Sequence, residues 1–137
     1  MKKTISIFVI VSSILLTSCG GSEPSTTIKV NMTDFAYNPN HFLVPAGHEI
    51  TLEAINNGAV VHNLIVMNAG TSLGENFDEA DEKNIYWKIE LTPGQSTTTS
   101  FTAPSEPGEY LIVCSTAGHY EAGMTAKLVV VAESVNQ

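Results

Sequence analysis

The chain has 137 residues, of which 43% are hydrophobic and 7% aromatic, and its 14 acidic residues outnumber 6 basic ones for a net charge of −8. This length fits one folded domain, and nothing in the composition indicates a second core. A surface this acidic is repelled by phosphate groups and anionic lipids, which excludes a nucleic-acid-binding protein and one held to a membrane by basic patches.

Residues 1–18 predict a bacterial export signal. Lys2 and Lys3 form its positively charged start, and the apolar stretch at residues 5–16 is too short to span a bilayer. The stretch ends in Leu-Thr-Ser-Cys, which resembles the lipobox of bacterial lipoproteins, where the signal is cut before a cysteine that carries a lipid. We therefore expect a lipid on Cys19 that anchors the protein to a bacterial membrane, on its periplasmic face or at the cell surface. An ordinary secretory signal is the alternative.

A polar segment rich in Gly, Ser, Pro and Thr comes next and has too few apolar groups to pack. We interpret residues 19–27 as a flexible tether that begins at the lipidated Cys19. Residues 28–133 then form the folded domain, which the tether holds away from the bilayer.

The two cysteines of the chain predict a metal ligand rather than a disulfide. An exported domain with an even number of cysteines would usually pair them. If Cys19 carries a lipid, however, Cys114 remains a single thiol in an oxidising compartment, where it is open to damage. Metal binding is the best explanation for such a residue.

The folded domain is predicted to be an antiparallel β-sandwich, an all-β fold. Apolar and polar residues alternate with period two at residues 28–32 and 50–54, which indicates half-buried strands. Turn-forming Gly, Pro and Asn separate the strands. Further strands are expected at residues 41–44, 60–67, 85–91, 96–102, 109–114 and 126–131. Residues 68–84 are acidic and poor in β-branched side chains, so we expect a long excursion there, with a short helix near residues 75–82.

One loop near the end of the domain offers three metal donors. Cys114, His119 and Met124 supply a thiol, an imidazole and a thioether within eleven residues, and these soft or borderline donors suit copper. A blue-copper electron-transfer site uses two His nitrogens, one Cys thiolate and a weak axial Met, so one more His is needed. His62, which lies within an apolar run and is followed by Asn63, is the candidate.

The other histidines, His41 and His48, flank a turn with no donor nearby, and we expect both to be solvated or at a strand edge. Met32 and Met67 are expected in the core.

The loop reads Cys-x3-Gly-His-Tyr-x2-Gly-Met, and together with the upstream His-Asn it resembles the cupredoxins, the type 1 blue-copper proteins. It looks most like the plastocyanin-like auracyanin group, and the resemblance covers residues 28–131. It implies a Greek-key sandwich with one copper ion held by His62, Cys114, His119 and Met124, although some cupredoxins have Gln or no strong axial ligand in place of the Met.

The resemblance also implies roles around the ligands. The ring edge of His119 is expected to reach solvent and to be the exit for the electron. The amide of Asn63 is expected to tie its strand to the Cys loop at Ser115 and so to fix the surroundings of the sulfur. An ordinary polar strand residue is the alternative for Asn63.

Partner docking is expected around His119. Ala117, Gly118, Tyr120, Ala122 and Leu64 form a candidate apolar rim there, with routine surface apolarity as the alternative. The acidic run at residues 75–82 either steers a basic partner or is a solvated loop.

The sequence therefore predicts a monomeric type 1 copper protein that carries single electrons between extracytoplasmic redox proteins, such as cytochromes or a membrane oxidoreductase or oxidase. A copper-binding carrier or chaperone without a role in electron transfer is the main alternative. An enzyme is not expected, because a catalytic copper needs further His clusters, and His41 and His48 alone cannot build one. A non-metal adhesin would remain only if the four donors were scattered in the fold.

Overall fold

The structure is a computed structural model that describes residues 23–132. The predicted export signal and Cys19 lie outside the described residues. The strands are β1 (Thr27–Thr33), β2 (Ala36–Asn38), β3 (His41–Pro45), β4 (Glu49–Asn56), β5 (His62–Met67), β6 (Ile85–Leu91), β7 (Ser96–Thr102), β8 (Gly108–Val113) and β9 (Thr125–Val131), and the helix is α1 (Glu79–Glu82).

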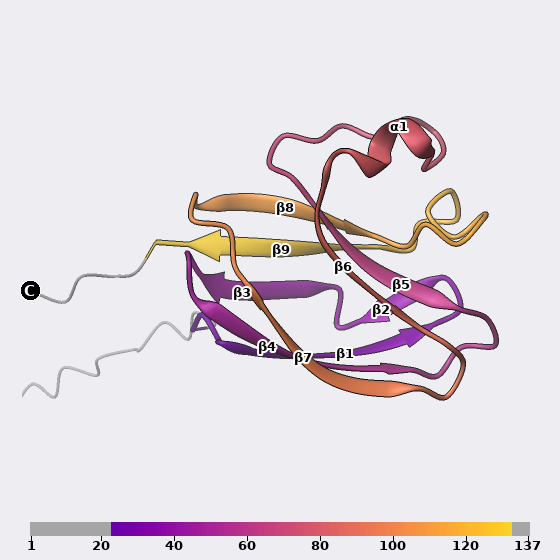
Figure 1. Ribbon diagram of the computed structural model, residues 1–137, viewed down its shortest axis with the longest axis horizontal. Coiled ribbons are helices and arrows are strands. Elements are labelled where there is room, and N and C mark those ends of the chain that lie inside the picture. Colours follow the sequence, from indigo (N-terminus) through magenta and orange to yellow (C-terminus); the bar gives the residue numbers. More distant parts are fainter. Residues whose placement is uncertain (1–22, 133–137) are drawn as a thin grey trace, which may run out of the picture.

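Two sheets pack face to face as a sandwich (Figure 1). One has four strands in the order β2-β1-β4-β7, and the other has five in the order β3-β9-β8-β5-β6. The buried side chains of alternating strand positions meet between the sheets, and both Met32 and Met67 are fully buried as expected. The all-β sandwich predicted from the alternation is confirmed.

Strand direction departs from the expected antiparallel pattern in two places. The pairs β1–β4 and β3–β9 are parallel, and the other pairs are antiparallel, so each sheet is mixed. Alternation of apolar and polar residues has the same period in both kinds of pairing. The sequence pattern therefore predicts the strands but not the direction of their neighbours.

The prediction missed one strand, and several element boundaries differ from the predicted ones. Strand β2 was missed because only one of its three residues, Tyr37, is buried. Strand β5 begins at His62 instead of residue 60, and Val60 is 43% exposed. The folded domain begins before residue 28, up to which the tether was expected to extend. The N–H of Ser25 donates to the carbonyl of Leu43 over 2.9 Å, and β1 begins at Thr27.

The acidic excursion covers the outer face of the five-stranded sheet, where α1 lies above β5 and β6 in Figure 1. Phe77 packs there against a small cluster that contains Ile65 and Met67, which explains why every residue of β5 is buried. The helix spans fewer residues than predicted. Asp78 caps it by accepting from the N–H of Ala80 over 2.8 Å, so part of the acidity of this run serves to start the helix.

Three connections meet at one end of the sandwich, which we call the ligand end: the β1–β2 turn, the β4–β5 connection and the β8–β9 loop (Figure 1). Strand β1 begins and strand β9 ends at the opposite end. Within residues 23–132, no helix has the length and apolar character needed to cross a membrane.

Candidate metal centre

Cys114 follows the last residue of β8 directly, so its sulfur is held at the end of a rigid strand. The residue is fully buried and forms no disulfide among the described residues. Its N–H donates to the carbonyl of Met124 over 3.3 Å, which closes the β8–β9 loop on itself. Both ends of the loop are therefore fixed next to each other.

The loop between these ends is folded back by its own hydrogen bonds. The N–H of His119 donates to the carbonyl of Thr116 over 2.9 Å, and the N–H of Met124 donates to the carbonyl of His119 over 2.9 Å. Gly118 has φ 80° and Gly123 has φ 93°, backbone conformations that a side chain disfavours. The turn expected at Gly118 is thus present, and it brings Nδ1 of His119 within 3.9 Å of Sγ of Cys114.

His62 reaches the same point from the first position of β5, which lies beside β8 in the sheet. Its Nδ1 atom lies 3.9 Å from Sγ of Cys114, and its side chain is fully buried. The donor atoms of His62, Cys114 and His119 all lie within 4.8 Å of one another. Neither His41, which is exposed on the edge strand β3, nor His48 belongs to this group.

Met124 is also fully buried and belongs to the same core cluster as Cys114. Two imidazole nitrogens, a thiolate and a thioether are the donor set of a type 1 copper site. Burial lowers the pKa of His119, and the neighbouring His62 lowers it further, so the ring of His119 is neutral at pH 7 and able to bind a metal. The four donors fit one copper ion.

The contact expected between Asn63 and Ser115 is present. The Nδ2 group of Asn63 donates to Oγ of Ser115 over 2.9 Å, and the N–H of Ser115 donates to Oδ1 of Asn63 over 2.8 Å. Thr116 adds a bond from its hydroxyl to the carbonyl of Val61 over 2.7 Å. These three bonds tie the residues beside Cys114 to the strand that carries His62.

The missed strand β2 supports the same strand from the other sheet. The hydroxyl of Tyr37 donates to the carbonyl of Asn63 over 2.7 Å. Burial raises the pKa of Tyr37 well above its usual value, and the negative charge of a Cys114 thiolate adds to this shift. Tyr37 therefore stays a neutral donor beside the sulfur.

Sequence reasoning also missed the β1–β2 turn, which lies over both histidines. Oδ1 of Asp34 lies 3.1 Å from Nε2 of His62 and accepts from the N–H of Ala59 over 3.0 Å. The Ala59 hydrogen bond lowers the pKa of Asp34, and the bond to His62 contributes in the same direction. The sequence offered only an Asp in a turn as a signal for this contact, and Asp residues are common in turns that have no function.

Phe35 is the next residue of this turn, and its ring centroid lies 4.7 Å from that of His119. Phe35 is 52% exposed, whereas His119 is only 5% exposed. The ring edge that was expected to face solvent is therefore mostly covered, and Phe35 presents aromatic surface next to it. Phe35 also has φ 67°, an uncommon conformation for a bulky residue.

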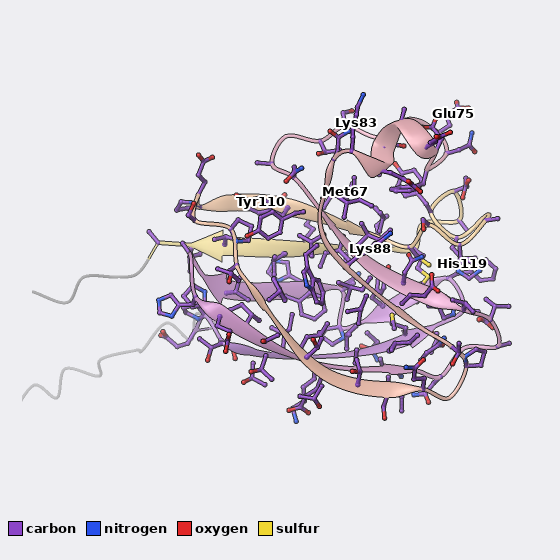
Figure 2. All side chains as sticks on the ribbon, in the orientation of Figure 1. Met67, Glu75, Lys83, Lys88, Tyr110 and His119 are labelled. Atoms are coloured by element: carbon purple, nitrogen blue, oxygen red, sulfur yellow. The ribbon has the colours of Figure 1, made fainter. Side chains whose placement is uncertain are left out.

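The residues expected to line the rim divide into three groups. Ala117, Gly118 and Ala122 are exposed, in the loop that carries His119. Tyr120 is half-buried, and its hydroxyl donates to the carbonyl of Gly74 over 3.3 Å. Leu64 is 1% exposed, so its expected place in the rim is wrong, because the side chain points into the core. Figure 2 shows His119 at the ligand end, far from Tyr110, which lies on β8.

Residues 24–131 match the family of copper-binding proteins described as the plastocyanin/azurin family. The chain is 36% identical over 127 residues to auracyanin-A of Chloroflexus aurantiacus, a match that covers 80% of this chain and 76% of that protein. Auracyanin-B of the same organism is 28% identical over 134 residues, with 81% and 57% covered.

Among solved structures, dithionite-reduced auracyanin from the photosynthetic bacterium Roseiflexus castenholzii is similar, with a TM-score of 0.67 and 31% identity. That match covers 80% of this chain and 99% of the other. Reduced rusticyanin shares the fold at 22% identity, with a TM-score of 0.55 over 80% of this chain and 82% of that one. The chain therefore belongs to the plastocyanin/azurin family of copper-binding proteins.

Proposed function

We propose that this protein carries single electrons between redox proteins outside the cytoplasm while a lipid on Cys19 holds it to a membrane. Membership of a blue-copper family and the His-Cys-His-Met donor set support a copper electron carrier. One copper ion at this site would alternate between Cu(II) and Cu(I) and so hold or release one electron.

The main support for the proposal is that the ligand side chains are buried and held in place by hydrogen bonds. His62, Cys114 and Met124 are fully buried, and the Asn63–Ser115 bonds join the two segments that hold the nitrogen and the sulfur. Donors held in this way keep their positions when the charge of the metal changes. Electron transfer is faster when the ligands do not have to move, so a rigid set of ligands favours a role in electron transfer.

The same burial counts against the alternative of copper delivery. A chaperone passes its metal on by letting an incoming donor displace one of its own, which requires an exposed ligand. Among the described residues of this site, the most exposed donor, His119, is 5% accessible and is packed against Phe35. Slow release of copper is therefore expected.

The proposed docking surface, which we call the His119 rim, consists of Phe35, Ala117, Gly118, Tyr120 and Ala122. Three of these are exposed small residues of the loop, and Phe35 adds an exposed ring in contact with His119. A small apolar surface suits brief contact with a redox protein whose own cofactor lies near its surface, such as a cytochrome or a membrane oxidoreductase.

The position of β1 supports the proposed membrane anchor. The first strand, β1, begins at the end of the sandwich opposite the ligand end (Figure 1). A lipid on Cys19, a few residues before the described part of the chain, would then hold the far end near the membrane. The His119 rim would face away from the bilayer, toward soluble or protruding partners.

The test is to load the purified domain with copper and to follow both its colour and its electron exchange. An intense blue charge-transfer band, a reversible one-electron couple and rapid electron exchange with a reduced cytochrome c would support the proposal. Rapid loss of Cu(I) to a chelator, without electron exchange, would instead identify a copper-delivery protein.

A further inference from the structure

The β1–β2 turn places a carboxylate directly against one of the copper-ligand histidines. Oδ1 of Asp34 lies 3.1 Å from Nε2 of His62, while Nδ1 of the same ring lies 3.9 Å from Sγ of Cys114. The two ring nitrogens therefore face different partners. If Nε2 carries the proton and donates it to Asp34, Nδ1 is left with the lone pair that a metal needs.

The position of the Asp34 carboxylate is set from a second side by the β4–β5 connection. The N–H of Ala59 donates to Oδ1 of Asp34 over 3.0 Å. A Cβ atom on Gly58 would lie 2.6 Å from Oδ1 of Asp34 and would collide with Nε2 of His62, so only glycine allows this close approach. The backbone is thus shaped to let the carboxylate and the imidazole meet.

The connection is itself attached to the core. The N–H of Gly58 donates to Oδ1 of Asn56 over 2.8 Å, and the fully buried Asn56 donates from Nδ2 to the carbonyl of Leu91 over 2.9 Å. Asp34 therefore rests on a fixed backbone, although its own side chain is 41% exposed. The contact with Asp34 thus connects the buried ligand His62 to a side chain that is partly exposed to solvent.

We propose that Asp34 is a positioning residue of the copper site, which holds the ring of His62 with Nδ1 free and lowers the reduction potential by placing a negative charge against a ligand. A negative charge near the metal favours the more positive oxidation state, because the attraction grows with the charge of the ion. A fixed hydrogen-bond partner on the far ring nitrogen also restricts rotation of the imidazole. This inference rests on the proposed electron-transfer function, since it concerns the potential at which the electron is held.

Two substitutions separate the charge from the hydrogen bond. Asp34→Asn keeps an oxygen that accepts from Nε2 of His62 but removes the charge, whereas Asp34→Ala removes both. The matched control is Glu121→Gln, which removes one charge from an exposed residue of the β8–β9 loop. The charge of Glu121 acts on His119, so this control measures the effect of a nearby charge that makes no contact with His62.

The experiment measures the reduction potential, the visible spectrum and the rate of copper loss to a chelator for the three copper-loaded variants and the unsubstituted protein. For Asp34→Asn we expect the blue band to remain and the ratio of Cu(I) to Cu(II) affinity to rise about three- to tenfold more than in Glu121→Gln, where tenfold equals about 59 mV for one electron. For Asp34→Ala we expect copper loss to be about 10-fold faster or more, as for other partners of metal ligands.

Equal potentials for Asp34→Asn and Glu121→Gln would overturn the charge effect, and an unchanged rate of copper loss in Asp34→Ala would overturn the positioning role. If Asp34→Ala does not fold, Asp34→Asn still decides the charge effect, and Asp34→Leu, which removes the acceptor but keeps the bulk of the side chain, takes the place of Asp34→Ala in the measurement of copper loss. A missing blue band in the unsubstituted protein would instead contradict the proposed function itself.

Discussion

Nδ1 of His62 lies 3.9 Å from Sγ of Cys114, although 52 positions separate the two residues in the chain. The neighbouring places of β5 and β8 in one sheet bring them together, and no local motif contains both. This juxtaposition turns three donors on one loop into a complete copper site.

Cys114→Ser is expected to abolish the blue band, because a serine hydroxyl does not form the thiolate bond that gives rise to the charge transfer. The hydroxyl is close to the thiol in size, so the fold should persist. Absorption spectra with added Cu(II) measure the band, and circular dichroism of the metal-free protein checks the fold. A blue band in this variant would show that another residue supplies the sulfur.

Asn63→Ala and Ser115→Ala should each destabilise the domain by about 1–3 kcal/mol, because each leaves a part-buried polar group without its partner. The double variant should lose less than the sum of the two, since both changes break the bond from Nδ2 of Asn63 to Oγ of Ser115. Urea unfolding of the metal-free variants measures these free energies. Strict additivity would mean that the contact does not stabilise the fold.

Met124→Leu should raise the reduction potential and keep the blue band, because an apolar side chain replaces a weak donor that favours Cu(II). The two side chains are similar in volume, so the cost in stability should stay below about 1.5 kcal/mol. Met67→Leu is the matched control, since Met67 is equally buried but lies in the separate cluster under the excursion. Voltammetry of both variants decides whether the effect is specific to position 124.

Phe35→Ala should slow electron exchange with a cytochrome while the spectrum of the copper stays the same, because the variant loses exposed ring surface at the His119 rim. Phe35→Gly should exchange electrons equally slowly but be more stable than Phe35→Ala by about 1 kcal/mol, since φ is 67° at this position and glycine adopts it without strain. Stopped-flow kinetics and urea unfolding measure the two effects. Unchanged exchange rates in both variants would remove Phe35 from the docking surface.

Cys19→Ser should move the protein from the membrane fraction to the soluble fraction of cells that express the full chain, because the hydroxyl cannot carry the thioether-linked lipid. Cys114→Ser serves as the control and should stay in the membrane fraction. Fractionation followed by immunoblotting makes the comparison. Soluble protein in both cases would indicate an ordinary secretory signal.

The donor set was predictable because most of it is local. Cys114, His119 and Met124 share one loop, and the Asn that follows His62 distinguishes that histidine from His41 and His48. The strands were predictable for a similar reason, since each shows its own alternation of apolar and polar residues.

Asp34 and Phe35 were not predictable, because they reach the histidines only after the two sheets have packed together. Their turn separates β1 from β2, a strand of three residues with a single buried side chain, and such a short element carries no periodic signal. The parallel pairings were hidden as well, because alternation does not depend on the direction of the neighbouring strand.

The place of β9 has a consequence for the order of events during synthesis. This strand follows Met124 and lies inside its sheet, between β3 and β8, so the sheet stays incomplete until β9 has been made. Loop closure over such distances is slow compared with local folding. The four donors are therefore assembled only after β9 has been made, and the copper ion is acquired by a domain whose strands are all in place.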